Sequence, residues 1–348
     1  GIHGVAPFAD LHISDYSMKT GTFHADHWAN ATANAATAGA VVQNNSWGVD
    51  IQIDTLQQDM INFGETAAES MALYWSNFGL LADSTSANNY VTQLNNFQNT
   101  GVIVYALSNN SNFTDSDFQA AMPELFPELE EAWITAVNID VTESQFIRRS
   151  APCGQTAEYC LGADGYDITV ASHVANGLSL HENQFGTSFV APQISGAVAL
   201  LAEHFPNHTP EQLVDRLLAT ADNTFFNADG TVSFSNGVSH AYSNEFGHGV
   251  MNVFAALQPV TTSSASLRLF TGASNVVGSS ASLLRTGIIS SRSFGDSISQ
   301  TLSNTTIQFY DALNGAFQLK ADAFAVPIDS TMPVLNISSA MGSIGSVG

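Results

Sequence analysis

The sequence predicts an α/β fold in which helices cover both faces of a mostly parallel sheet. The first observation is that short apolar runs alternate with helical patterns over the first 259 of 348 residues. Strands separated by helices need crossover connections, which set the strands parallel and bury both faces of the sheet. The second is that 45% of the residues are hydrophobic, enough for a sizeable core and too many for a disordered chain.

The individual elements follow from the local patterns. Apolar runs predict strands at residues 9–17, 40–48, 102–108, 132–139 and 167–172. Helical spacing predicts helices at residues 24–39, 56–79, 86–101, 188–204 and 210–221. Gly39 and Gly101 fit the ends of two of these helices. Thr209 fits an N-cap, followed by Pro210 at the first helical position.

The charge of the chain is strongly acidic, with 31 Asp and Glu residues against 8 Lys and Arg residues and a net charge of −23. Such a balance argues against nucleic acid and against anionic membrane surfaces as partners. No run of 18 apolar residues is present, so we expect no membrane-spanning helix.

The acidic charge is confined to one part of the chain. Residues 1–259 hold 27 acidic and 4 basic residues, whereas residues 260–348 hold 4 of each and are dense in serine, threonine and glycine. We therefore expect two domains with a boundary after residue 259. Alternating stretches at 306–312 and 316–324 predict that the second is a small β-rich extension.

Two cysteines, Cys153 and Cys160, lie in a glycine-rich loop. We expect a disulfide that closes a short surface loop, which suits an oxidising compartment. The alternative is two buried thiols that behave as small hydrophobes. A metal site is the weakest interpretation, because the spacing is not C-x-x-C and the chain has no second pair.

Ser188 is the first candidate for chemistry, because it follows Gly186-Thr187 at the predicted start of a long helix. The N-terminus of a helix carries unpaired N–H groups and a positive dipole end, which could stabilise an oxyanion that forms beside the serine. The alternative is an ordinary N-cap, since serine and threonine are common there. The pattern is not the G-x-S-x-G nucleophile elbow.

Five stretches in this order resemble the subtilisin-like serine proteases, the subtilases, across residues 1–257. They are "GVAPFADLHISDYS" near the start, "VVQNNSWGVD" at 41–50, "GVIVYALSNNSNF" at 101–113, "GTSFVAPQISGAVALL" from 186 and "GHGVMNVFAAL" at 247–257. The resemblance implies a three-layer subtilisin-like fold. It also implies acyl transfer on peptide bonds.

The resemblance assigns roles to single residues. Ser188 matches the nucleophile, and Asn109 rather than Asn110 matches the side chain that completes the oxyanion hole. Ser108 stands where the family usually has glycine. The substrate-binding residues that the resemblance implies, which would pair with a peptide as an added strand, are Ser46, Trp47, Gly48, Ala106, Leu107 and Ser108. The structural alternatives are that Trp47 only fills the core and that Asn109 only closes a turn.

The aspartate and histidine motifs of the family are absent from this sequence, and His3 precedes a glycine but lacks the rest of the histidine motif. Because the chain begins with Gly1 inside a motif, we expect a fragment of a longer, processed or cut protein, inactive by itself. A non-catalytic peptide-binding relative, a pseudoenzyme, is the alternative. A serine-rich adhesive or structural protein would explain the tail but not the five stretches.

We therefore expect a serine endopeptidase fragment that acts on polypeptides, is exported or located at the cell surface, and is a monomer. Phe-Gly-Asp at 294–296 and the pattern at 311–317 resemble the linker of secreted or autotransporter subtilases, so an outer-membrane anchor could lie outside this chain. No organic cofactor and no metal ligand are expected from these residues. Structural calcium occurs in the family, but no ligand set can be assigned.

Overall fold

The computed structural model describes residues 4–15, 23–142, 145–174 and 177–260, and the C-terminal segments 266–271, 274–279, 288–290, 306–320, 325–327 and 345–346. The chain divides into two compact units. Unit 1 comprises residues 1–202, 209–232 and 240–253, and unit 2 comprises residues 203–208, 233–239 and 254–348. The domain boundary predicted after residue 259 stays a prediction.

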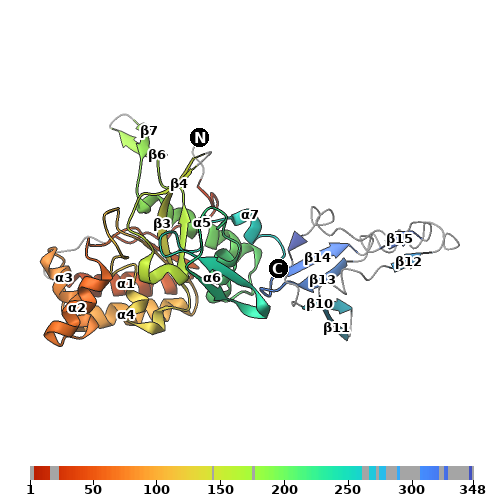
Figure 1. Cartoon of the computed structure of the whole chain (residues 1–348), viewed down its shortest axis with the longest axis horizontal. Coiled ribbons are helices and arrows are strands. Elements are labelled where there is room, and N and C mark those ends of the chain that lie inside the picture. Colours follow the sequence, from red (N-terminus) through yellow and green to blue (C-terminus); the bar gives the residue numbers. More distant parts are fainter. Residues whose placement is uncertain are drawn as a thin grey trace. The chain divides into compact units, whose positions relative to one another are not determined.

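Unit 1 is built on a central sheet whose main strands are parallel (Figure 1). The strands are β1 (Val42–Asn45), β2 (Val102–Ala106), β3 (Trp133–Thr142) and β5 (Cys160–Ala163), with β4 (Gln145–Arg148) antiparallel on the end of β3. The order is β1-β2-β3, and β5 pairs with the middle of β3. Every residue of β2 is buried, as expected of a strand covered on both faces.

Helices precede and follow these strands along the chain. They are α1 (His24–Thr37), α2 (Ile53–Phe63), α3 (Ala67–Asn77), α4 (Ser84–Gln98), α5 (Thr187–His204), α6 (Pro210–Ala219) and α7 (Val253–Ala256). Short 3₁₀ helices cover Met122–Glu124, Pro127–Leu129, Gly154–Tyr159 and Ser235–Gly237. The prediction of Thr209 as an N-cap is confirmed, because its side chain accepts a hydrogen bond from the amide of Gln212.

An aromatic cluster joins the helices to the sheet. The Trp28 ring of α1 lies 5.2 Å from the Trp75 ring of α3 and 5.7 Å from the Tyr90 ring of α4, measured between centroids. The Tyr90 hydroxyl lies 3.1 Å from the Tyr105 hydroxyl of β2. Burial raises the pKa values of Tyr90 and Tyr105 well above their usual range, so both phenols stay neutral and act as hydrogen-bonding groups in the core.

The single helix predicted over residues 56–79 was wrong, because the structure has two helices there. Gly64 ends α2 in the left-handed conformation, with a φ of 71°. Thr66 then caps α3 in a reciprocal arrangement with Glu69, in which each side chain binds the backbone N–H of the other residue. The break therefore comes from local backbone chemistry that the apolar spacing does not reveal.

Two strand predictions also need correction. Residues 9–15, the described part of the predicted strand 9–17, form no strand, and the side chains of Leu11 and Ile13 are 82% and 83% exposed. A strand needs a neighbouring backbone, and no described strand pairs with this segment. The stretch 167–172 forms β6 (Ile168–Val174), but it pairs antiparallel with β7 (Gly177–Gln184) and not with the central sheet.

Unit 2 holds most of the remaining strands. A five-stranded sheet contains β10 (Ser266–Thr271), β11 (Ser274–Ser279), β13 (Thr306–Tyr310), β14 (Ala316–Lys320) and β16 (Gly345–Ser346). β12 (Ile288–Ser290) pairs with β15 (Ala325–Pro327). The pair of β8 (Gly230–Ser233) and β9 (Ser239–Tyr242) lies mostly in unit 1. The strands predicted at 306–312 and 316–324 are β13 and β14; residues 321–324 lie outside the described residues.

Asp311 organises the turn between β13 and β14. It is 3% exposed, and its carboxylate accepts hydrogen bonds from the backbone N–H groups of Leu313, Gly315 and Val260. These three donors satisfy a buried carboxylate and hold the turn closed.

Among the described helices, none combines the length and apolarity needed to cross a membrane.

Candidate active site

Ser188 is the second residue of α5, and its side chain is half-buried. The residue that precedes the helix, Gly186, has a φ of 142°, a conformation that other residues rarely adopt. A Cβ atom at Gly186 would lie 3.1 Å from Oδ1 of Asn109. The glycine of the Gly-Thr-Ser motif is therefore required both by the backbone and by the close approach of Asn109.

Asn109 lies in the loop that follows β2, at the carboxyl end of the strand. Its Oδ1 accepts hydrogen bonds from the backbone N–H of Thr187 at 2.9 Å and from the Thr187 hydroxyl at 3.1 Å. The oxygen is thereby committed to the start of α5, and the amide NH₂ has no acceptor among the described residues. Asn109 is exposed, and its contact with Thr187 places it next to the residue that precedes Ser188.

Pro192 explains how Ser188 is tied to the neighbouring strand. Proline lacks an N–H group, so the carbonyl oxygen four residues earlier, that of Ser188, has no partner in the helix. Ser46 Oγ lies 3.4 Å from this carbonyl oxygen and donates to it. In return, the Ser188 hydroxyl donates to the carbonyl oxygen of Ser46 at 3.3 Å. Because of the proline, the Ser188 carbonyl oxygen can accept the Ser46 hydroxyl, and this hydrogen bond joins α5 to the loop after β1.

The proposed substrate-binding segment Ser46–Gly48 lies directly after β1. The Trp47 ring packs 4.3 Å from the Trp28 ring and 5.8 Å from the Tyr105 ring, between centroids. Its indole thus belongs to the aromatic cluster. Gly48 is exposed, and its backbone forms no hydrogen bond with any described residue. The backbone at Gly48, rather than the Trp47 side chain, is therefore accessible to an added strand.

Most of the second proposed segment, Ala106–Ser108, is buried or hydrogen-bonded within the fold. Ala106 and Leu107 are 6% and 2% exposed. The Leu107 N–H donates to the carbonyl of Ala136, and its carbonyl accepts from the Thr187 hydroxyl at 2.6 Å. Only Ser108 of this segment is partly exposed. The structure brings Ser46, Ser108, Asn109 and Ser188 to one edge of the sheet, at the carboxyl ends of β1 and β2.

Two carboxyl groups flank Ser108, and sequence reasoning missed both. The Ser108 hydroxyl donates to Oδ1 of Asp50 at 2.6 Å, and the Ser108 N–H donates to Oδ2 of Asp117 at 2.6 Å. Asp117 is 1% exposed, and burial raises its pKa to about 7, with the nearby Asp50 acting in the same direction. The only sequence signal was that Asp50 follows the Ser-Trp-Gly stretch by two residues.

No histidine of the described residues makes a hydrogen bond to Ser188. His248 is fully buried and its Nδ1 lies 3.0 Å from Nδ1 of His240. Burial lowers the pKa of His248 to about 4. His3 lies outside the described residues. Among the described residues, the hydrogen-bond partner of the Ser188 hydroxyl is thus the Ser46 carbonyl oxygen and not a histidine.

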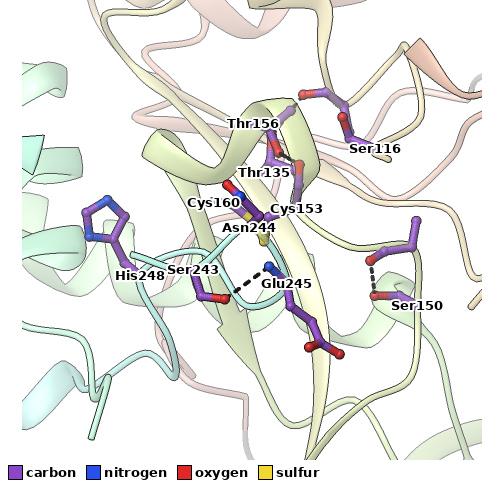
Figure 2. The surroundings of a disulfide bond; sticks show 12 residues. Ser116, Thr135, Ser150, Cys153, Thr156, Cys160, Ser243, Asn244, Glu245 and His248 are labelled. Atoms are coloured by element: carbon purple, nitrogen blue, oxygen red, sulfur yellow. Dashed lines mark hydrogen bonds between the residues drawn. A yellow bond between two sulfur atoms is a disulfide. The ribbon is translucent and has the colours of Figure 1, made fainter. Parts of the chain in front are cut away.

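The disulfide joins Cys153 to Cys160 and lies in the core, with both residues 0% exposed (Figure 2). The Thr156 hydroxyl donates to the Cys153 carbonyl at 2.8 Å, which closes a turn inside the loop. Cys160 begins β5, so the bridge ties the 3₁₀ segment to the central sheet. The bridge itself is therefore buried, whereas the loop that it closes reaches the surface at Gln155 and Glu158, which are exposed. Among the described residues, no cluster of three or more His, Cys, Asp or Glu side chains could hold a metal ion.

The comparisons with known proteins identify the family. The Subtilase family matches residues 1–249, and the chain belongs to this family. It is 29% identical over 260 residues to an extracellular serine protease of Serratia marcescens, covering 64% of this chain and 24% of that protein. It is 25% identical over 240 residues to the Neisserial autotransporter lipoprotein NalP of Neisseria meningitidis serogroup B, covering 63% of this chain and 21% of NalP.

The chain thus spans about a quarter of the length of these relatives. A solved structure, the self-cleaved protease domain of PatA, shares 21% identity with a TM-score of 0.43 and covers 67% of this chain and 66% of that one. The family assignment agrees with the three-layer α/β architecture of a mostly parallel sheet and helices.

Proposed function

We propose that this chain carries the nucleophile and the oxyanion-binding side of a serine endopeptidase, with Ser188 as the nucleophile. The observation that carries the proposal is the orientation of the Asn109 side chain. Because Oδ1 is bound by Thr187, the NH₂ group of the same amide is the part left to donate. The free donor, the first turn of α5 and the serine hydroxyl lie together at one edge of the sheet.

The chemistry follows from these positions. The Ser188 oxygen attacks a peptide carbonyl carbon, and the carbonyl oxygen becomes an oxyanion. The Asn109 NH₂ and the backbone N–H of Ser188 donate to this oxyanion, since N–H groups in the first turn of a helix have no partner within the helix. The acyl-enzyme forms as the amine leaves, and water then releases the acyl group and regenerates the serine.

The proton of the Ser188 hydroxyl needs an acceptor stronger than the Ser46 carbonyl, which can accept a hydrogen bond but not the proton. We propose that a histidine oriented by an aspartate is supplied by polypeptide outside this sequence, because neither family motif is present in it. Loss of the histidine of such a triad costs on the order of 10⁶ in turnover, a figure known from a member of this family. This chain alone should therefore bind peptides with almost no cleavage.

The substrates are polypeptides that pair with the backbone of Gly48 as an added strand. The names of two relatives include the words extracellular and autotransporter, which supports a secreted or surface location for this protein. An outer-membrane anchor would then belong to a region outside this chain. The second candidate function is peptide binding without catalysis, and it is favoured by the lack of a base beside Ser188 among the described residues.

The test compares this chain with a longer polypeptide that adds the aspartate and histidine segments of the family in front of Gly1. We expect the longer form to hydrolyse casein and to lose this activity on treatment with a serine-directed phosphonate or after Ser188→Ala. Asn109→Ala should lower kcat by about 10²–10³, the general cost of one oxyanion donor. Asn110→Ala is the matched control, because the Asn110 side chain binds the Asn112 amide within the loop.

Two results would contradict the proposal. Strong hydrolysis by the 348-residue chain would mean that it contains its own base. No hydrolysis by the longer form, even after removal of any propeptide, would favour the peptide-binding alternative.

A further inference from the structure

Asp50 presents a carboxylate beside the residues proposed to hold the substrate. Its side chain is exposed, and Oδ1 accepts the hydroxyl proton of Ser108 at 2.6 Å. The Ser108 oxygen in turn accepts the backbone N–H of Asn110 at 3.0 Å. One carboxylate oxygen is therefore held in place from the loop after β2. The other, Oδ2, has no hydrogen-bond partner among the described residues.

Two buried side chains, those of Asp117 and Gln119, hold the loops on either side of the Asp50–Ser108 contact. Asp117 is 1% exposed, and its two oxygens accept the backbone N–H groups of Ser108 at 2.6 Å and Ala120 at 3.2 Å. Gln119 is 0% exposed, and its Oε1 binds the N–H of Val49, next to Asp50. These contacts connect the loop after β1 to the loop after β2 and leave Asp50 Oδ2 as the accessible acceptor.

A second observation concerns the Gln119 side chain, whose oxygen binds the Val49 N–H next to Asp50. The Gln119 Nε2 is buried and has no hydrogen-bond partner among the described residues. The amide that carries it approaches Gly48 closely, since a Cβ at Gly48 would lie 3.3 Å from Gln119 Oε1 and 3.7 Å from Asp117 Oδ1. An unpaired buried donor costs free energy, and a carbonyl group or a water molecule brought by a ligand would satisfy it.

We propose that Asp50 selects substrates that carry arginine or lysine immediately before the scissile bond, an inference that rests on the proposed function. The residue whose carbonyl meets Ser188 and Asn109 must lie next to Ser108, which directly precedes Asn109 in the chain. A side chain from this residue that extends between Gly48 and Ser108 reaches Asp50. A guanidinium or ammonium group then donates to Asp50 Oδ2 in a charge-assisted hydrogen bond.

The composition of the chain agrees with this preference. Residues 1–259 hold 4 basic residues, so this part of the chain offers few cleavage sites to other copies of itself. Arg148 and Arg149 pair with Glu245 at 3.4 Å and Asp140 at 2.7 Å, and Arg216 is 0% exposed. The net charge of −23 would also attract any basic peptide, so the test needs a control of equal charge.

The experiment uses the longer polypeptide of the proposed-function test and peptidyl-coumarin amides that differ only in having Arg, Lys, Leu or Glu before the reporter. We expect kcat/KM for Arg and Lys to exceed that for Leu by about 10-fold or more. Asp50→Asn should lower the Arg and Lys values about 10-fold and leave the Leu value within about twofold. Glu131→Gln, an exposed site with the same charge change, should alter none of them.

A second measurement separates this inference from the proposed function. Fluorescence anisotropy follows binding of labelled peptides ending in Arg, Leu or Glu to the 348-residue chain, where no cleavage is needed. Tighter binding of the Arg peptide, lost in Asp50→Asn but kept in Glu131→Gln, supports the inference even if Ser188 never reacts. Preferential cleavage of the Leu substrate, or equal effects of Asp50→Asn on all peptides, would overturn the inference while the endopeptidase proposal stands. Equal binding of the three peptides, together with a longer polypeptide that cleaves none of its substrates, would overturn both.

Discussion

Asn109 and Thr187, which are 78 residues apart in the sequence, are joined by two hydrogen bonds to a single oxygen. Asn109 Oδ1 accepts the Thr187 N–H at 2.9 Å and the Thr187 hydroxyl at 3.1 Å. The single proton of this hydroxyl is shared between Asn109 Oδ1 and the carbonyl oxygen of Leu107, which is closer, at 2.6 Å. Thr187 thereby holds the start of α5 against the end of β2 and fixes the oxygen of the Asn109 amide.

Thr187→Val should destabilise the fold, because valine keeps the shape but leaves the buried Leu107 carbonyl without its donor. We expect the free energy of unfolding to fall by about 1–3 kcal/mol, measured by urea titration. Thr55→Val is the control, since Thr55 is exposed on α2 and binds only the neighbouring Asp54, and it should stay within about 0.5 kcal/mol of the original protein. Equal effects of both changes would show that the Thr187 hydroxyl has no special role.

Gly186→Ala should destabilise the turn that precedes α5. Alanine must adopt a φ of 142°, and its Cβ would approach Asn109 Oδ1 to 3.1 Å. We expect a loss of about 1–3 kcal/mol in stability, measured by thermal unfolding. We also expect weaker labelling of Ser188 by a phosphonate in the longer polypeptide. Gly4→Ala, where the added Cβ meets nothing within 4 Å, is the control. Unchanged stability of Gly186→Ala would mean that the turn relaxes at no cost.

Replacing both cysteines by alanine should lower the free energy of unfolding by about 2–3 kcal/mol, the chain-entropy effect of a bridge across 7 residues. Both side chains are buried, so the two smaller residues add a packing loss in the same direction. The measurement is denaturant unfolding of the unreduced protein and of the variant. Mass spectrometry of the unreduced chain that found two free thiols would contradict the disulfide itself.

The buried Asp117 should make the stability depend on pH. Its pKa is raised from the ordinary value of 3.8 to about 7, so the unfolded chain loses this proton at a lower pH than the folded one. The stability that it contributes is therefore fully present below pH 3.8 and is lost as the pH rises to about 7. The difference between the two pKa values corresponds to roughly 4 kcal/mol.

Asp117→Asn removes this titration, but it also removes one of the two side-chain oxygens that accept backbone N–H groups. The free energy of unfolding of the variant should therefore be lower than that of the original protein at low pH. The difference should shrink between pH 4 and 7, where the original protein loses stability. Urea titrations at several pH values measure the difference in slope. Glu131→Gln, an exposed site, should follow the original protein at every pH. Parallel curves for Asp117→Asn and the original protein would mean that the buried carboxyl does not titrate in this range.

The sequence by itself determined the elements whose signals are local. The apolar run 102–108 became the buried strand β2, and Thr209-Pro210 began α6, because burial pattern and capping chemistry act over a few residues. The Gly-Thr-Ser motif likewise begins a helix at Thr187, with Ser188 in its first turn. The order of the motifs also pointed to the family, since order along the chain is a property of sequence alone.

The tertiary structure decided what depends on residues far apart in the chain. The Ser46 hydroxyl meets the carbonyl that Pro192 leaves free, and Asp50 meets Ser108 across 58 residues. No local pattern encodes such contacts, because they depend on how β1 and β2 align in the sheet. The exposed state of Leu11 and Ile13 has the same origin. Their alternation favours a strand, but a strand forms only where the fold provides a partner for its backbone.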